Sequence, residues 1–274
     1  FPPNGGMGPD FVLIEGGLEP LGRYTLTNDF YVMTTEVTQA MWTDVMATSG
    51  YGYSPSWSVT LGQGDLYPAY EVSWNDAIAF ANALSVMTGR AECYANNDLD
   101  PQFSTPYDCT GFRLLTEAEW EYAARSGTTS GTTSGFWTGQ GSDLGGPPSH
   151  NYNTNGTETI VDGVSNPFLR DYAWYGGNNN NQYGDLGSKE VGQKLPNGVG
   201  LYDVHGNLWE WTADWWGCSF PPTSTDPYCA SIFRRMARGG GWFSSPGDLL
   251  ASNRSYYLPG NSNPNLGFRL GILP

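Results

Sequence analysis

The amino-acid sequence predicts one mixed domain of the α/β class (α+β type) that is low in regular secondary structure. Among its 274 residues, 39% are hydrophobic and 15% are aromatic, which is enough to form a sizeable core. Only 14% are charged, so the composition is neither that of a disordered chain nor that of a coiled coil. The 37 glycines and 19 prolines indicate many turns and few long helices.

The first part of the chain predicts two strands and a helix. Residues 1–10 are rich in proline and glycine, and we expect them to form an N-terminal arm. Phe11–Gly17 and Tyr24–Thr38 are predicted strands, the second because its residues alternate and many are β-branched. Thr38 is then placed to cap a helix over Gln39–Ala47.

A second helix is predicted from a capping signal at Ser73. Asp76 stands at the third helical position, where its carboxylate can bond back to the capping residue. Gly89 supplies the C-terminal stop. Residues at helical spacing form one apolar face, consisting of Trp74, Ala77, Ile78, Ala81 and Leu84.

A third helix begins with the same kind of signal. Thr116 and Glu119 form a capping box, and the helix is expected to run to about Arg125. Its inward face carries Trp120, Ala123 and Ala124. Glu117, Glu119 and Glu121 lie where negative charge complements the helix dipole, so we interpret them as structural and not catalytic.

The second half of the chain is irregular before it returns to strands. Residues 126–190 are dominated by Gly, Ser, Thr and Asn, and we expect ordered loops laid over the core. Met236–Phe243 is predicted as a central strand and Asn265–Leu270 as the last one. Arg238 and Arg269 are predicted to be buried or half-buried salt-bridge residues of the sheet.

The stretch from Asn197 to Trp216 mixes tryptophans with oxygen-bearing side chains. Four of the eleven tryptophans of the chain lie in the last eight residues of this stretch. The stretch also contains Asp203, Asn207, Glu210 and Asp214. Because buried carboxylates need partners or a metal, this mixture disfavours an ordinary core strand. We expect a rigid, irregular loop and a short strand, bent at Gly206, with oxygen ligands facing one Ca²⁺.

The four cysteines form two local pairs in the sequence, Cys93 with Cys109 and Cys218 with Cys229. Four cysteines allow three pairings that sequence alone does not distinguish, although the short intervening loops favour the local one. Neither pair has the spacing of a metal site. Two structural disulfides indicate an oxidising compartment, that is, the periplasm, the cell surface or the medium.

Charge and hydropathy exclude several kinds of partner. A net charge of −15 argues against nucleic acid and against an anionic membrane. No stretch approaches the roughly 18 apolar residues of a membrane span. A chain that begins FPPNGG without methionine is expected to be a processed mature form, which agrees with an extracytoplasmic protein.

Four stretches together resemble one known family. They are Tyr67–Ser85, Gly111–Gly127, Asn197–Trp216 and the segment from Arg238 to Leu270. In this order they resemble the formylglycine-generating enzyme family, also called the sulfatase-modifying-factor domain. The resemblance implies a C-type-lectin-like fold over residues 11–274. It also implies that residues 91–110, which the family lacks at this place, are an inserted loop containing the first cysteine pair.

The resemblance implies specific metal ligands. Position by position, the family's calcium site in this motif falls on Asp203, the carbonyls of Gly206 and Leu208, and Glu210. A second calcium site of the family has no clear match. His205 lies within the motif, and we interpret it as a loop hydrogen-bonding residue.

The family's copper chemistry is not expected. Its two copper-binding cysteines would fall within residues 242–245 and 246–249, where this chain has no thiol. Cys218 and Cys229 lie upstream of that segment. Serine does not replace a soft thiolate as a copper(I) ligand, so we predict no copper, no formylglycine generation and no catalytic residues.

The function predicted from these features is non-catalytic binding or surface structure. Aromatic and small polar residues suit a recognition surface, and they are Trp242, Phe243, Ser244, Ser245, Asp248, Ser255, Tyr256, Tyr257 and Asn261. The expected partner is a protein, a glycan or another copy of the chain. The alternative is an oxidative tailoring enzyme of the siderophore-maturation type, which resembles this fold without the copper cysteines.

Overall fold

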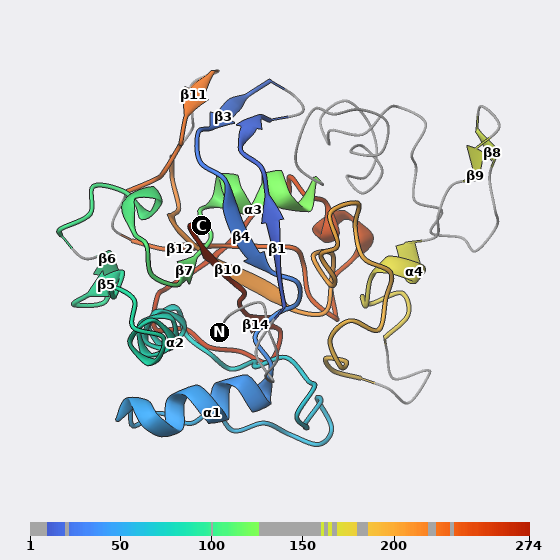
Figure 1. Cartoon of the computed structure of the whole chain (residues 1–274). Coiled ribbons are helices and arrows are strands. Elements are labelled where there is room, and N and C mark those ends of the chain that lie inside the picture. The colour runs from blue at the N-terminus through green and yellow to red at the C-terminus, as the bar shows by residue number, and fades with distance from the viewer. Residues whose placement is uncertain are drawn as a thin grey trace.

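The computed structural model describes residues 10–19, 22–99, 101–125, 160–161, 164–165, 169–179, 186–218, 223–230 and 233–274. The predicted N-terminal arm and most of the predicted loops at 126–190 lie outside these ranges. Short strands and a few helices alternate along the described residues, which confirms the predicted α+β class (Figure 1).

The first of two four-stranded sheets brings together residues from early and late in the sequence. Its strand order is β1-β4-β15-β7, and all three pairings are antiparallel. Val32 of β4 has Val12 on one side and Gly271 on the other. The strands are Phe11–Ile14 (β1), Phe30–Met33 (β4), Leu270–Ile272 (β15) and Arg113–Leu114 (β7).

The second sheet has the strand order β13-β12-β10-β14. Its longest strand, β10, is antiparallel to β12 and parallel to β14. All seven residues of β10 are buried. The strands are Ser255–Tyr257 (β13), Arg235–Arg238 (β12), Trp209–Trp215 (β10) and Leu266–Gly267 (β14).

The sequence interpretation of β10 was wrong in one respect. Residues before Trp209 do form an irregular loop, but the strand itself is a fully buried element in the interior of its sheet, with one register shift against β12 between Trp211 and Trp215. Its carboxylates are tolerated there because both have partners. Glu210 pairs with Arg269, and Asp214 accepts hydrogen bonds from two backbone N–H groups.

Other predicted strands are shorter than expected. The predicted strand Tyr24–Thr38 divides into β3 and β4, and Asn265–Leu270 contributes to both β14 and β15. β12 ends at Arg238 because Gly239 and Gly240 have φ of 93° and 77°. A smaller sheet, in the order β11-β3-β2, consists of Ser224–Thr225, Tyr24–Leu26 and Gly17–Leu18.

Two helices pack together on one side of the strands (Figure 1). α1 (Gln39–Ser49) is capped by Thr38, whose side chain accepts a hydrogen bond from the Met41 N–H at 3.2 Å. α2 (Trp74–Met87) has the predicted capping box between Ser73 and Asp76. The principal core lies between these helices and the sheets, where aromatic rings from distant segments meet: Trp42, Phe80 and Phe268.

The third predicted helix, α3 (Glu117–Ala124), lies on the other side of the strands, with the predicted capping box present (Figure 1). Its three glutamates form ion pairs with arginines, a structural role, although the sequence interpretation attributed that role to the helix dipole. Glu119 pairs with Arg113, Glu117 with Arg254, and Glu121 with Arg125, Arg238 and Arg23. A second core cluster surrounds Trp120 of this helix.

The remaining regular elements are short. They are β5 (Tyr94–Ala95), β6 (Asp98–Leu99), β8 (Ile160–Val161), β9 (Val164–Ser165), α4 (Leu169–Tyr172) and the 3₁₀ helices η1 (Pro106–Asp108) and η4 (Pro246–Leu249).

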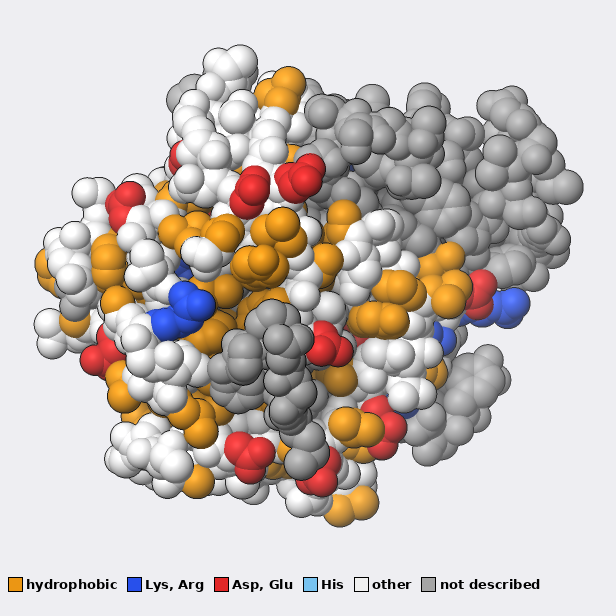
Figure 2. All heavy atoms as spheres, viewed as in Figure 1, with side chains coloured by type: hydrophobic (Ala, Val, Ile, Leu, Met, Phe, Trp, Pro, Cys, Tyr) orange, Lys and Arg blue, Asp and Glu red, His pale blue; other side chains and the backbone are white. Residues whose placement is uncertain are grey.

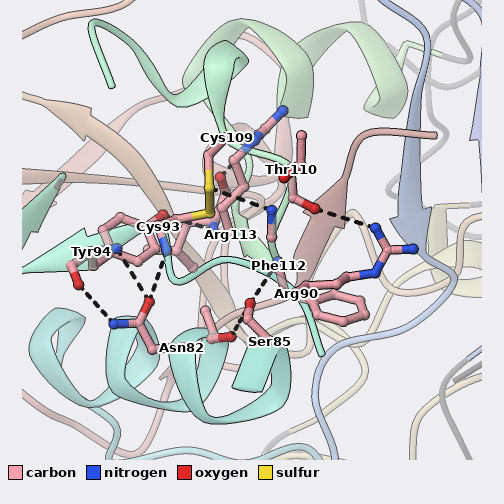
Figure 3. Close-up of a disulfide and its surroundings, with 12 residues drawn as sticks. Asn82, Ser85, Arg90, Cys93, Tyr94, Cys109, Thr110, Phe112 and Arg113 are labelled. Carbon is pink, nitrogen blue, oxygen red and sulfur yellow. Dashed lines mark hydrogen bonds between the residues drawn. A yellow bond between two sulfur atoms is a disulfide. The ribbon is translucent and has the colours of Figure 1, made fainter. Parts of the chain in front are cut away.

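The described part of the segment 91–110 is held against α2 by hydrogen bonds and is closed by its own disulfide (Figure 3). Cys93 and Cys109 form a disulfide, and both are fully buried. The Asn82 side chain accepts hydrogen bonds from the Cys93 and Tyr94 N–H groups and donates one to the Tyr94 carbonyl. Cys218 and Cys229 form the second disulfide, so both predicted local pairings are confirmed.

The surface agrees with the acidic composition. Asp and Glu side chains are scattered over the face shown in Figure 2, whereas Lys and Arg appear at few places. Among the described residues, no helix is long and apolar enough to cross a membrane.

Candidate cation site and ligand face

The loop before β10 has the backbone of a tight curl. Asp203, Gly206 and Asn207 all have positive φ, at 55°, 90° and 57°. Only glycine fits at position 206, because a Cβ there would lie 2.2 Å from the Trp174 carbonyl oxygen. The curl therefore turns successive polar groups toward the interior, as a bent cation-binding loop does.

A buried glutamate that the sequence interpretation missed holds this loop. Glu36 accepts hydrogen bonds from the Leu208 N–H and from the Asn207 side chain, both at 3.2 Å. The Asn207 side-chain oxygen accepts the Lys189 N–H at 2.9 Å. Asn207 thus bridges two loops and has its oxygen occupied. Glu36 stands in the stretch Glu36-Val37-Thr38, but nothing in its sequence context identifies it as a neighbour of residue 207.

Glu210, a predicted cation ligand, lies in a buried ion pair. Arg269 donates to both carboxylate oxygens, with Nη2 at 2.7 Å from Oε1 and Nε at 2.8 Å from Oε2. The Trp120 Nε1–H donates to Oε2 at 2.7 Å. The negative charge of Glu210 is therefore balanced by Arg269, which confirms the predicted role of that arginine.

Asp203 is the predicted ligand that best fits a cation. Its Oδ2 accepts the Gly192 N–H at 2.7 Å, whereas its buried Oδ1 has no hydrogen-bond partner within the described part of the chain. Burial raises the pKa of Asp203 to about 6. Burial, with the nearby Asp203 and Glu210, also raises the pKa of Glu36 well above its usual range.

Three buried carboxyl groups therefore surround one guanidinium. With Glu36, Asp203 and Glu210 all ionised, Arg269 would balance one charge and the half-buried Lys194 would act in part on Asp203, so protons or a further cation must balance the rest. The unpartnered Asp203 oxygen fits a cation, and Glu210 would have to share its oxygens with Arg269. Within the described residues, this cluster included, no group of three or more His, Cys, Asp or Glu side chains has the arrangement of a metal site, so a cation here would need backbone carbonyl ligands as well.

His205 behaves as the sequence predicted. Its Nδ1 lies 2.7 Å from the Leu249 carbonyl oxygen, so Nδ1 carries the proton and donates to that oxygen. The imidazole ties the loop to η4.

The predicted ligand residues 242–248 surround η4. Trp242 is buried and its Nε1–H donates to the Pro264 carbonyl, so it packs beneath the surface and is not itself exposed to a ligand. Phe243 is 68% exposed. Ser244 accepts the Gly241 N–H at its hydroxyl, and Ser245 donates its hydroxyl to Asp248 at 2.7 Å, closing a capping interaction for η4.

The other predicted ligand residues lie on a different element, β13. Tyr256 is 38% exposed and its ring centroid is 4.4 Å from that of Trp216. Tyr257 faces the other side of the strand and packs edge-on against the buried Trp211. Ser255 pairs with Ala237 across the strands, and Asn261 donates its N–H to Leu258 in a turn. The predicted ligand residues therefore come from two segments of the chain, one around Phe243 and one around Tyr256.

The position of the expected copper thiols contains no cysteine. Both disulfides together contain all four cysteines of the chain, and none is free. The segment in which the two thiols were expected, residues 242–249, contains Ser244 and Ser245 followed by η4.

The chain belongs to the family defined by the sulfatase-modifying factor enzyme 1-like domain, whose family model matches residues 3–272. This confirms the resemblance inferred from the four sequence motifs.

Similar proteins carry several different names. A relative from Paenibacillus barcinonensis named "Chaperone protein LppX" is 29% identical over 95% of this chain and 88% of its own length. The formylglycine-generating enzyme of Thermomonospora curvata is 29% identical over 76% of this chain, which spans only 56% of that enzyme. In the mouse enzyme the identity is 30%, and the match covers 74% of this chain and 43% of the enzyme.

Solved structures have the same fold over nearly the whole chain. Treponema denticola variable protein 1 superposes with a TM-score of 0.65 at 28% identity, over 96% of this chain and 95% of that one. PvdO from Pseudomonas aeruginosa superposes with a TM-score of 0.64 at 22% identity, over 97% of this chain and 95% of its own, and this likeness concerns the fold alone.

Proposed function

We propose that this protein is a non-catalytic, extracytoplasmic binding protein whose partner is another protein. The observation that carries this proposal is that all four cysteines are in disulfides, so none is free at residues 242–249, where the resemblance places the family's copper ligands. Without a thiolate at that place, the copper(I) chemistry of the family has no ligand. The disulfides also support an oxidising compartment.

A protein partner agrees with the similar relative and with the surface. The Paenibacillus relative, which aligns with most of both chains, is named a chaperone. Exposed Tyr256 lies on β13, exposed Phe243 lies in the turn before η4, and aromatic side chains of this kind contribute contact area at a low entropic cost. A glycan or a second copy of the chain remains an alternative occupant of this face.

We further propose that one Ca²⁺ stabilises the loop before β10. Asp203 would supply a carboxylate oxygen, and the carbonyls of Gly206 and Leu208 would supply two more. Glu210 would complete the set by sharing a carboxylate that Arg269 already neutralises. The buried, unpartnered Oδ1 of Asp203 supports this assignment.

The absence of catalysis is tested by a direct search for turnover. The purified protein would be incubated with copper(I), O₂ and a cysteine-containing peptide, and oxygen uptake and aldehyde formation would be followed by an electrode and by mass spectrometry. We expect neither above the level given by a copper-only control. Oxygen uptake that depends on the protein would contradict the proposal and favour an oxidative tailoring enzyme.

A further inference from the structure

A stacked series of aromatic and cationic side chains lies beside β13, outside the cation site. The Arg234 guanidinium carbon is 4.8 Å from the centroid of the Tyr256 ring and 5.4 Å from that of Phe233. Tyr256 in turn contacts Trp216, and the Arg254 guanidinium lies 5.1 Å from the Trp216 ring. Cation–π contacts of this kind fix the plane of a guanidinium.

The strand register explains why these residues meet. Met236 of β12 opposes Tyr256 of β13, so Arg234, two residues before Met236, projects on the same face as Tyr256. Leu258, two residues after Tyr256, belongs to this face as well. In the described sheet β13 is an edge strand, so the face borders open backbone.

Arg234 differs from the other arginines because its guanidinium has neither an ion pair nor a hydrogen bond among the described residues. Eight of the ten arginines, all within the described residues, form ion pairs with Asp or Glu. The other two are Arg90 and Arg234. Arg90 donates to the Thr110 carbonyl, whereas the guanidinium of Arg234 has no hydrogen bond or ion pair among the described residues. The chain has a net charge of −15, yet this cation is unpaired. Because aromatic contacts also hold its guanidinium in place, Arg234 can bind an anion.

The surroundings of Arg234 favour a protein as the source of that anion. Phe233 is 66% exposed and Leu258 is 44% exposed. An aliphatic side chain such as Leu258 has no ring face on which a sugar could stack, and the Tyr256 ring is already in contact with Arg234 and Trp216. Exposed apolar groups around an arginine and two aromatic residues are typical of the energetic centre of a protein interface.

We propose that Arg234, held between Phe233 and Tyr256, is the anchor of a protein-docking surface and binds an Asp or Glu carboxylate flanked by apolar side chains of the partner. The inference rests on the proposed function only in taking the partner to be a protein. The planar guanidinium donates two parallel N–H groups to the carboxylate, and Phe233 and Leu258 cover the flanking apolar groups.

The test uses two matched peptides and arginine side-chain NMR. The full chain, labelled with ¹⁵N-arginine, would be titrated with acetyl-Leu-Asp-Leu-amide and, separately, with acetyl-Leu-Asn-Leu-amide at millimolar concentration. We expect the Arg234 Nε–H signal to shift saturably with the Asp peptide, and the Asn peptide to bind about tenfold more weakly because it lacks the charge-assisted hydrogen bonds.

Two lysine variants complete the design. Arg234→Lys keeps the charge but removes the planar fork, and we expect it to weaken binding of the Asp peptide about tenfold. Arg90→Lys is the matched control, since Arg90 also lies over a ring and lacks a carboxylate partner, and it should bind as the wild type does.

Three results would overturn the inference: equal binding of both peptides, unchanged binding by Arg234→Lys, or an equal effect of Arg90→Lys. A folded Arg234→Lys variant, shown by an unchanged amide spectrum, makes its result interpretable. Failure here with no copper-dependent turnover would leave the proposed function intact, whereas turnover would contradict that function without affecting the peptide result.

Discussion

Asp214 is a buried carboxyl group that connects helix α3 to the Cys218–Cys229 disulfide. Its oxygens accept hydrogen bonds from the Glu117 N–H at 2.6 Å and from the Cys229 N–H at 2.8 Å. It therefore connects the first turn of α3 to the second disulfide. Burial, together with the charge of Glu117, raises the pKa of Asp214 from 3.8 to about 8.

This pKa predicts that the protein loses stability as the pH rises. Between pH 3.8 and about 8 the folded state holds a proton on Asp214 that the unfolded chain has released. Since the folded state binds more protons there, the free energy of unfolding falls as the pH rises through this range. Urea unfolding at pH 5 and at pH 8.5 measures the effect.

The contribution of Asp214 is isolated by a neutral variant. Asp214→Asn carries no titrating group, so its free energy of unfolding should fall less between the two pH values than that of the wild type. Carbon-13 NMR of the side-chain carboxyl gives an independent measurement, and a midpoint below about pH 5 would contradict the prediction.

Residue-scale inference from sequence succeeded where the interaction is local or the alternatives are few. The caps at Thr38, Ser73 and Thr116 were predictable because a cap and its partner are three residues apart. Arg238 and Arg269 were assigned to salt bridges because a buried arginine needs an anion. The contacts of Glu36 with residues 207 and 208 were not predictable, since about 170 residues separate them.

At the scale of elements, the segment 91–110 depends on its disulfide and on the sheet. Besides the Cys93–Cys109 bond, Asp98 forms an ion pair with Arg235, whose guanidinium carbon lies 3.5 Å from the rings of both Trp74 and Trp215. One exposed segment is thereby fixed to the most buried strands.

Removing the Cys93–Cys109 disulfide is expected to cost about 3 kcal/mol of stability. The cysteines are 16 residues apart, and a closed loop of that size limits the unfolded chain by roughly this amount. The double variant Cys93→Ala, Cys109→Ala would be compared with the wild type by urea unfolding. Asp44→Ala is the control, since Asp44 is exposed on α1 and its loss should cost less than about 1 kcal/mol. Equal losses in the two variants would contradict the prediction.

Element boundaries were predicted less well than element types. Capped helices were predicted within a few residues, whereas strands were merged or extended, because a period of two does not show where a chain leaves one sheet for another. β10 was misjudged because its carboxylates argued against burial, and their partners come from distant segments.

At the scale of the whole molecule, calcium is expected to raise stability. With free Ca²⁺ at about 100 times its dissociation constant, the gain should be about 2.7 kcal/mol over the protein in EGTA. Thermal unfolding in the two buffers measures it, and Asp203→Ala should abolish the response. Asp44→Ala, at an exposed position of α1, should keep it. Identical unfolding of the wild type in both buffers would contradict the calcium site.

The whole-molecule prediction was the most reliable part of the sequence interpretation. Four motifs in a fixed order identified the fold, because such an order is rarely met by chance. The ligand face stays a prediction. Its residues come from the segment around η4 and from β13 to the turn after it, and Arg234 and Trp216 join Tyr256 only through strand register.

The position of β4 between β1 and β15 has a consequence for the order of synthesis and folding. The strand formed by residues 30–33 pairs with residues 270–272, so its sheet cannot be complete until those residues have been synthesised. Residues 11–272 must therefore all leave the ribosome before this sheet can close, so the sheet closes late and slowly. In the extracytoplasmic location that we propose, such late closure would leave the chain unfolded for long enough to be exported.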